Sequence, residues 1–228
     1  MTEIHQTDIC VIGAGPAGLF AVFQLGLVDL RCHVIEALDR PGGQLTALYP
    51  DKPIYDMPGF RVIDGQPLAD RLMDQISPFE TRFHWGRQAI SIARAEPQEG
   101  LPLGGWQVGM KDGGAVLSKV AVMATGGGIL GYGRTQAAPP GTDTFFQTDS
   151  GLIPTDTGAF QTATSGIFAI GDGCVYPGKL KLILSAFHEA ALMAQAAFAI
   201  CHPQKRLKSQ YTTSSSELQR RLGVRGAD

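Results

Sequence analysis

The sequence predicts an α/β fold, with a parallel sheet, helices on both of its faces and a small antiparallel β layer. Three observations support this prediction. A short apolar run over 9–12 leads directly into a glycine-rich turn and a helical pattern over 16–27. A second apolar run over 32–35 follows, as expected of a strand–helix–strand unit whose two strands are parallel. A third glycine-bounded apolar run, 166–170, lies near the end of the chain.

The glycine-rich turn after the first apolar run has the spacing of a dinucleotide-binding turn. Its glycines are Gly13, Gly15 and Gly18, with Pro16 and Ala17 between the last two. Gly13 permits a tight turn, Gly15 lets the backbone approach a pyrophosphate, and Gly18 lets the helix pack closely on the strand. The helix start also presents backbone N–H groups and a positive dipole end to phosphates. We therefore expect a Rossmann-like site at these five residues.

An acidic residue follows the second apolar run, where the ribose of a dinucleotide is expected. Glu36 stands 18 positions after Gly18, which is near the spacing of the acid that binds a ribose hydroxyl. The alternative is a structural glycine-rich turn with a solvated Glu36. The order of strand, glycines, helix, strand and acid favours the dinucleotide site.

A second glycine-rich signature lies far along the chain, and we interpret the two as halves of one FAD cradle. The third apolar run ends at Gly171 and Asp172, at the strand end where open α/β sheets bind ligands. Another buried-strand pattern, 119–124, ends at Thr125 and Gly126. An Asx turn is the alternative for Asp172. The first half of the cradle favours contact with the cofactor.

Downstream of Glu36, three residues have side chains or backbone properties that suit contact with a flavin ring. Gly43 permits close approach of the backbone to a ligand. Gln44 both donates and accepts hydrogen bonds, which suits the polar edge of the ring. Tyr49 offers an aromatic plane for stacking, although taken alone it would be a core or surface tyrosine.

These motifs resemble those of the ferredoxin–NADP reductases of the thioredoxin-reductase-like type. The resemblance covers 1–128 and about 150–228. It is carried by Gly42-Gly43-Gln44 with Ala47-Leu48-Tyr49-Pro50-Asp51-Lys52-Pro53-Ile54-Tyr55-Asp56, by Ile167-Phe168-Ala169-Ile170-Gly171-Asp172, by Tyr176-Pro177-Gly178-Lys179-Leu180-Lys181-Leu182-Ile183-Leu184, and by Tyr211-Thr212-Thr213-Ser214-Ser215. It implies FAD as the cofactor, with Glu36 at the adenosine ribose and Gln44 and Tyr49 at the flavin. Thioredoxin reductase itself is disfavoured because its redox dithiol is absent.

The resemblance implies further contacts with FAD. Ala89 would lie beside the adenine through its backbone, and Asp172 would bind the ribityl chain. Thr212 would reach the flavin and Tyr211 would cover its other face. In the family the C-terminal extension, here 203–228, covers the flavin, commonly across a homodimer.

The domain organisation implied is one discontinuous FAD-binding domain, 1–128 and 150–228, interrupted by a short linker over 129–149. In the resembling family, the chain leaves the FAD domain here for an NADPH-binding domain. Such a domain needs several strands and helices, and one βαβ unit alone takes about 30 residues. The linker is too short to form that domain. The motifs described above still predict that FAD binds, whereas the short linker leaves direct use of NADPH open.

Two longer patterns complete the predicted fold. The sequence predicts a helix over 182–200 whose N-terminal end points at the flavin; its predicted inward residues are Leu184, Phe187, Ala191, Ala194 and Phe198. The runs 106–110 and 115–117 flank Asp112-Gly113, which predicts a hairpin.

Composition limits the partners and the compartment. The net charge of −2 at pH 7 offers no surplus of positive charge for nucleic acid. No run reaches the ~18 apolar residues of a membrane span, and no signal peptide is recognisable. The four cysteines are scattered without a Cys-x-x-Cys pair, which argues against a zinc site or a dithiol centre and suits a reducing compartment. We expect a cytoplasmic protein without nucleic-acid or membrane partners.

Two hypotheses of function follow. The first is an FAD-dependent oxidoreductase that passes electrons between a reduced donor and an iron–sulfur or similar acceptor. Its partner would be ferredoxin or another small redox protein, steered by Lys205, Arg206 and Lys208, although a solvated lysine face explains these residues equally well. The second is a non-autonomous FAD electron-transfer module that needs a partner protein, or a trimmed reductase domain.

Overall fold

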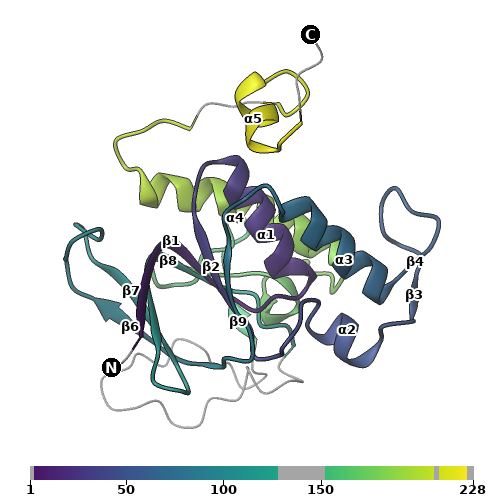
Figure 1. Cartoon of the computed structure of the whole chain (residues 1–228), viewed down its shortest axis with the longest axis horizontal. Coiled ribbons are helices and arrows are strands. Elements are labelled where there is room, and N and C mark those ends of the chain that lie inside the picture. The colour runs from purple at the N-terminus through teal and green to yellow at the C-terminus, as the bar shows by residue number, and fades with distance from the viewer. Residues whose placement is uncertain (1–2, 128–151, 208–210, 225–228) are drawn as a thin grey trace.

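The computed structural model describes residues 3–127, 152–207 and 211–224, and the predicted linker 129–149 lies outside them. A seven-stranded sheet forms its centre (Figure 1). The strands of this sheet are β1 (Ile4–Ile12), β2 (Cys32–Ile35), β5 (Arg82–His84), β6 (Ala89–Ala95), β7 (Gly105–Met110), β8 (Ala115–Met123) and β10 (Ile167–Ala169). Two small sheets pair β3 (Pro53–Ile54) with β4 (Ile63–Asp64), and β9 (Ile153–Pro154) with β11 (Cys174–Val175).

The central sheet is parallel at one end and antiparallel at the other. β5, β2, β1 and β8 run parallel in that order, and β1 pairs with β8 from Ile4 opposite Ala115 to Ile12 opposite Met123. The other edge of β8 is shared, because β7 pairs antiparallel with its first half and β10 pairs parallel with its second half. The predicted hairpin is confirmed: Asp112 Oδ1 accepts a hydrogen bond from Gly114 N at the turn between β7 and β8.

Three helices gather on one face of this sheet. They are α1 (Pro16–Leu27), α3 (Gly65–Ile76) and α4 (Ile183–Cys201), and α1 packs against both of the others. The α/β class is confirmed. In the described part of the chain, the second face is packed by strand residues instead of a helix layer, because the antiparallel strands bring Trp106, Val108 and Met110 over it.

Helix α4 packs through a face rich in alanine, which the sequence pattern indicated only in part: Ala194 is buried as predicted, and the predicted inward residues Phe187 and Phe198 are half-buried against the core. Ala186, Ala190, Met193, Ala194 and Ala197 are buried, and the predicted inward residue Leu184 is 48% exposed. Alanines let α4 approach α1 closely, so the inward face is not the one with the largest side chains.

The length and composition of α4 correct the expectation that no run in the sequence is long and apolar enough for a membrane span. With 19 residues and a mean hydropathy of 1.4, it is long and apolar enough to cross a membrane by these two criteria. A core helix of a soluble protein meets the same criteria. In this protein α4 packs on α1 and β8 and carries a fully buried glutamate, Glu189, which suits such a core helix.

The C-terminal helix α5 (Ser216–Arg221) lies far from the short helix α2 (Gln44–Leu48), beyond the ends of α1 and α4 (Figure 1). The Ser215 side chain caps α5 by accepting a hydrogen bond from Leu218 N. Arg221 fastens α5 to the end of α1 by donating to the Leu27 carbonyl at 2.9 Å.

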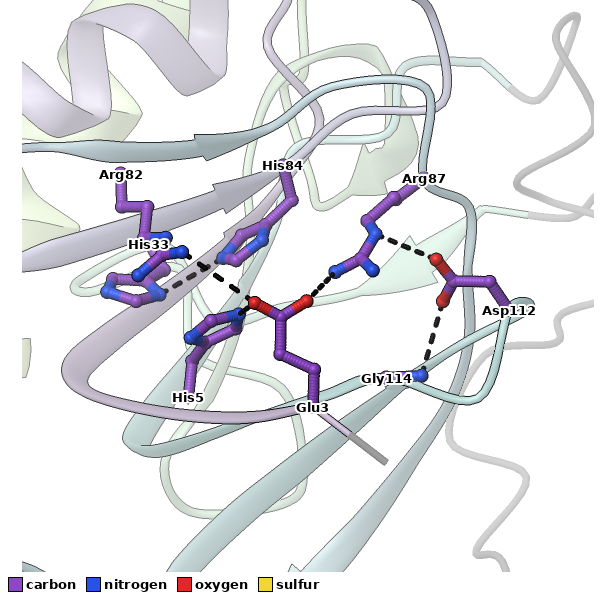
Figure 2. Close-up of polar contacts among 8 residues, drawn as sticks. All are labelled: Glu3, His5, His33, Arg82, His84, Arg87, Asp112 and Gly114. Carbon is purple, nitrogen blue, oxygen red and sulfur yellow. Dashed lines mark hydrogen bonds and ion pairs between the residues drawn. The ribbon is translucent and has the colours of Figure 1, made fainter. Parts of the chain in front are cut away.

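A polar network ties the beginning of β1 to β5 and to the β7–β8 hairpin (Figure 2). Its members are Glu3, His5, His33, Arg82, His84, Arg87, Asp112 and Gly114. His33 Nδ1 lies 3.1 Å from His84 Nε2, and burial lowers the pKa of both imidazoles to about 4. No group of His, Cys, Asp and Glu side chains in the described ranges is arranged to hold a metal ion.

Candidate functional site

A cavity of about 280 Å³ lies where β1, β2, β8 and β10 end. It is lined by Gly13, Gly15, Pro16, Ala17, Glu36, Gly43, Gln44, Leu45, Tyr49, Ala124, Thr125, Gly126, Gly171, Asp172, Lys181, Leu182, Ile183 and Ala186. The structure therefore brings together segments that the sequence separates by more than a hundred residues. The carboxyl ends of parallel strands are where open α/β sheets bind ligands.

The first wall of the cavity is the turn between β1 and α1. Gly13 has φ +106°, and a Cβ there would lie 2.4 Å from the Ala124 carbonyl oxygen. Gly15 and Pro16 line the cavity at the start of α1, whose N-terminus carries no side-chain cap. A Cβ on Gly18 would lie 2.0 Å from the Gly13 carbonyl oxygen. Gly18 is therefore placed behind the wall, where it allows close packing of α1, and does not line the cavity.

Glu36 follows β2 and is held by the backbone around it. Its carboxylate accepts from Ala14 N at 2.7 Å and from Leu38 N at 2.9 Å, and the residue is 2% exposed. These bonds fix both carboxylate oxygens at the cavity.

Gly43, Gln44 and Tyr49 line the cavity from α2 and its two ends. Gly43 has φ +55° and approaches the turn of α1, since a Cβ there would lie 3.1 Å from Gly15 Cα. The Gln44 Nε2 amide is buried and has no hydrogen-bond partner among the residues that the structure describes. Buried amides are almost always paired, so an unpaired donor in a cavity wall indicates a ligand acceptor opposite it. Tyr49 is 48% exposed and leaves part of its ring open to solvent.

The second half of the site comes from the ends of β8 and β10. Thr125 and Gly126 line the cavity after β8, and Gly171 and Asp172 line it after β10. Gly171 has φ +73°, and a Cβ there would lie 2.9 Å from the Ala17 Cβ. The turn after β10 can therefore pack against the start of α1 only because it carries a glycine.

Helix α4 completes the cavity with residues that were not predicted individually. Lys181, Leu182, Ile183 and Ala186 line it, and the α4 N-terminus has no side-chain cap. The sequence did indicate that the beginning of this helix faces the ligand. Two uncapped helix N-termini, those of α1 and α4, thus meet one cavity, which favours an anionic ligand.

Besides Gly18, three predicted site residues do not line the cavity of the same chain. Ala89 begins β6 opposite Met110, outside the cavity lining. Tyr211 is 72% exposed, and the Thr212 carbonyl accepts from Gln219 Nε2 of α5. Both precede α5, which is fastened near Leu27 at the far end of α1.

The four cysteines are free and buried. Burial raises the pKa of every one of these thiols, to about 12 for Cys174 and Cys201. Buried thiols with raised pKa values are poor nucleophiles, so these residues offer no dithiol chemistry.

The glycine turn after β1, the carboxylate after β2 and the cavity across the strand ends define a Rossmann-type dinucleotide-binding fold. A family model described as an NAD(P)-binding Rossmann-like domain matches residues 11–76. Among solved structures, the thioredoxin reductase of Lactococcus lactis superposes with a TM-score of 0.68 at 14% identity, over 86% of this chain and 99% of that chain. That of Streptococcus pyogenes superposes with a TM-score of 0.69 at 17% identity, over 87% and 99%. These structures show the fold.

Sequence relatives show the family. The ferredoxin–NADP reductase of Parvibaculum lavamentivorans is 34% identical, over 97% of this chain and 99% of the relative. That of Mesorhizobium japonicum is 33% identical, over 99% of this chain and 100% of the relative. The chain belongs to the ferredoxin–NADP reductase family, whose members are oxidoreductases.

The alignment with these relatives also contains many positions without a counterpart in this chain. It runs over 346 positions with the Parvibaculum protein, whereas this chain has 228 residues, so at least 118 positions have no residue of this chain.

Proposed function

We propose that the cavity binds FAD and that the chain is an FAD-dependent electron-transfer oxidoreductase. The observation that carries this proposal is the convergence of four strand ends and two uncapped helix N-termini on one cavity that contains the unpaired Gln44 amide. When bound, FAD supplies both two-electron and one-electron chemistry, which suits exchange between nicotinamide and iron–sulfur partners.

The residues present fit this cofactor. Glu36 would hold the adenosine ribose, and the turn of Gly13 and Gly15 would hold the pyrophosphate. Gln44 would donate to an acceptor on the ring, and Asp172 would accept from the ribityl hydroxyls. The lining residues would surround the pyrophosphate, ribose and flavin positions, so the adenine end of the ligand would extend beyond the cavity. The adenine contact at Ala89 would belong to that outer part.

A separate proposal concerns whether NADPH reduces the bound flavin directly. We propose that the linker 129–149, outside the described residues, replaces the NADPH-binding domain of the family. The 118 or more unmatched positions in the alignment support this proposal. Hydride transfer needs reacting atoms held about 3–3.5 Å apart, and this chain would lack the domain that holds the nicotinamide there. We therefore expect slow turnover with NADPH and electron supply by another donor.

The alignment positions that have no residue of this chain also favour a second candidate function. This candidate is an FAD module that works only with a partner protein, or a trimmed reductase domain. The acceptor in either case would be ferredoxin or another small redox protein, as the names of the relatives suggest. We also propose a cytoplasmic location, which the free, buried cysteines support.

A homodimer would account for Tyr211 and Thr212. Within one chain these residues precede a helix fastened at the far end of α1 from the cavity. We propose that they cover the flavin of a second copy. A sizing measurement on the FAD-bound protein checks this: wild type should elute as a dimer, whereas a monomer with full FAD affinity would contradict the proposal.

The experiment that tests the proposed function is anaerobic titration of the FAD-loaded protein. We expect the flavin absorbance to bleach readily with dithionite and slowly with NADPH or NADH at micromolar concentrations. Fast bleaching by NADPH would show that the chain holds the nicotinamide without the missing domain. A Gly15→Val variant, which obstructs the pyrophosphate turn, is the control and should take up no FAD.

A further inference from the structure

Behind the cavity wall lies a buried carboxylate that the proposed cofactor contacts do not use. Glu189, on α4, is 0% exposed. Its Oε2 accepts from Gly171 N at 2.6 Å, and its Oε1 accepts from the Tyr176 hydroxyl at 2.7 Å. The Lys179 ammonium forms an ion pair with Oε1, and the Lys179 side chain is itself 6% exposed. His188, which precedes Glu189 in the sequence, is exposed, so the side chains of His188 and Glu189 point in different directions.

The donors to Glu189 all come from the segment that follows β10. This segment lines the cavity at both ends, with Gly171 and Asp172 at its start and with 181–183 at its end. Glu189 lies less than two helical turns after Ile183, where α4 begins. One carboxylate therefore fastens the two cavity-lining parts of this segment to the same helix.

Burying the charged pair of Glu189 and Lys179 is costly, and apolar side chains could fill the same part of the core. Burying two ions costs several kcal/mol each, and an apolar replacement of such a pair is often as stable. The hydrogen bonds that Glu189 accepts are nonetheless short, at 2.6 Å from Gly171 N and 2.7 Å from the Tyr176 hydroxyl. Burial and the Glu189 carboxylate together raise the pKa of the Tyr176 hydroxyl. Lys179 also lies 5.3 Å from the centre of the Tyr176 ring. Such an arrangement suits a positioning role better than a purely stabilising one.

We infer that Glu189 and Lys179 are positioning residues of the flavin site. Glu189 holds the Gly171–Asp172 turn through Gly171 N and so aims the Asp172 carboxylate at the ligand. Lys179 balances the charge of Glu189 and fastens the loop that leads into the cavity-lining residues 181–183. This inference rests on the proposed binding of FAD to the cavity.

The two charges predict opposite effects on the flavin. Reduction adds negative charge to the ring, so a buried negative charge nearby disfavours reduction and a positive charge favours it. Glu189→Gln removes the negative partner and should raise the midpoint potential. Lys179→Met removes the positive partner and should lower it. Loosening of the fold alone would not produce shifts of opposite sign.

The experiment compares five proteins reconstituted with FAD at pH 8. They are wild type, Glu189→Gln, Lys179→Met, the double variant of these two, and Lys119→Met. Lys119 forms an ion pair of 2.8 Å with Asp8 near the C-terminal end of α4, away from the cavity, and serves as the matched control. The FAD dissociation constant, the midpoint potential and far-ultraviolet circular dichroism are measured for each protein.

We expect each single variant to bind FAD roughly tenfold more weakly than wild type, because Glu189→Gln weakens the hydrogen bond to Gly171 N and Lys179→Met releases the loop that leads into 181–183. The double variant restores charge balance, so it should fold, keep a potential near that of wild type and still bind FAD more weakly. Lys119→Met should change neither FAD binding nor the potential.

Folded variants with unchanged affinity and potential would overturn the inference, as would potentials of the two single variants that move in the same direction. If the single variants do not fold, an unchanged FAD affinity in the double variant would overturn it as well. Failure of wild type to bind FAD would instead contradict the proposed function, so the two failures are distinguishable.

Discussion

The close packing of Gly18 against the turn of Gly13 allows a direct test of how α1 is held at the cavity. In Gly18→Ala, the new Cβ would lie 2.0 Å from the Gly13 carbonyl oxygen and 3.4 Å from the Ala124 Cβ. The clashing atom belongs to the backbone, so it cannot move aside as a flexible side chain can. Overpacking costs about 1–3 kcal/mol and occasionally more, and the clash here is severe, so we expect a loss of about 3 kcal/mol.

This loss would be a large part of a typical free energy of unfolding of about 5–15 kcal/mol. Relief of the clash must move α1 away from the strand ends, and Pro16 and Ala17 line the cavity at that point. Gly18→Ala should therefore weaken FAD binding as well as stability. The assays are urea unfolding of the FAD-free protein and titration with FAD followed by quenching of flavin fluorescence.

Gly59 provides the matched control, because it has φ +85° and no heavy atom within 4 Å of its Cβ position. Gly59→Ala should cost only the strain of a positive φ, about 1–2 kcal/mol, and leave FAD binding unchanged. The reasoning is refuted if Gly18→Ala unfolds at the same urea concentration as wild type and binds FAD equally well.

Three further predictions concern other parts of the structure. Burial lowers the pKa of His33 and His84 from 6.5 to about 4, so as the pH falls the unfolded chain takes up protons before the folded chain does. The free energy of unfolding, measured with urea, should therefore fall by about 2 kcal/mol between pH 6.5 and pH 4, a figure that allows for the partial solvent exposure of these side chains. Gln44→Leu removes a buried donor that has no partner, so the FAD-free protein should melt no lower than wild type while FAD binds about tenfold more weakly in calorimetry. Arg221→Ala removes the bond of α5 to the Leu27 carbonyl and should lower stability by about 1 kcal/mol in thermal unfolding.

Each of these predictions has a control. His33→Gln should reduce the acid sensitivity, and a pH profile identical to that of wild type would contradict the assignment. Gln66→Leu, on the exposed side of α3, should leave FAD binding unchanged. Arg220→Ala changes an exposed arginine of the same short helix and should not alter the melting temperature; an equal loss in both arginine variants would contradict the role of Arg221.

The first half of the site could be predicted because its physical requirements are local. The Gly13 turn, the α1 start and Glu36 all lie within one strand–helix–strand unit, and the predicted helix 16–27 has the same bounds as α1. Glycine spacing reports on backbone geometry, which the sequence expresses directly. The turn at Gly171 and Asp172 was also placed correctly at a strand end.

The parts that could not be predicted depend on contacts between distant segments. The inward face of α4 is set by how closely α1 approaches, which favours Ala190 over the larger Leu184, whereas the predicted burial of Ala194 is confirmed. Periodicity alone gives the period of a helix but leaves open which of two adjacent apolar stripes is buried. The pairing of Glu189 with Lys179 joins a helix to a loop, and no short motif expresses it.

The placement of Tyr211 and Thr212 differs for another reason. Their contact with the flavin is implied only by the resemblance, in which the extension commonly covers the flavin across a homodimer. In a single chain, Arg221 fastens the neighbouring helix to the end of α1, away from the cavity. Sequence reasoning about one chain cannot distinguish a contact within it from a contact between two copies.

The central claim is that one chain folds its separated strand ends into a pocket for FAD, and equilibrium dialysis against FAD tests it most directly. We predict that the purified protein retains one FAD per chain and that an excess of NADP does not displace it. Protein that retains no FAD, or that exchanges it stoichiometrically for NADP, would contradict the account.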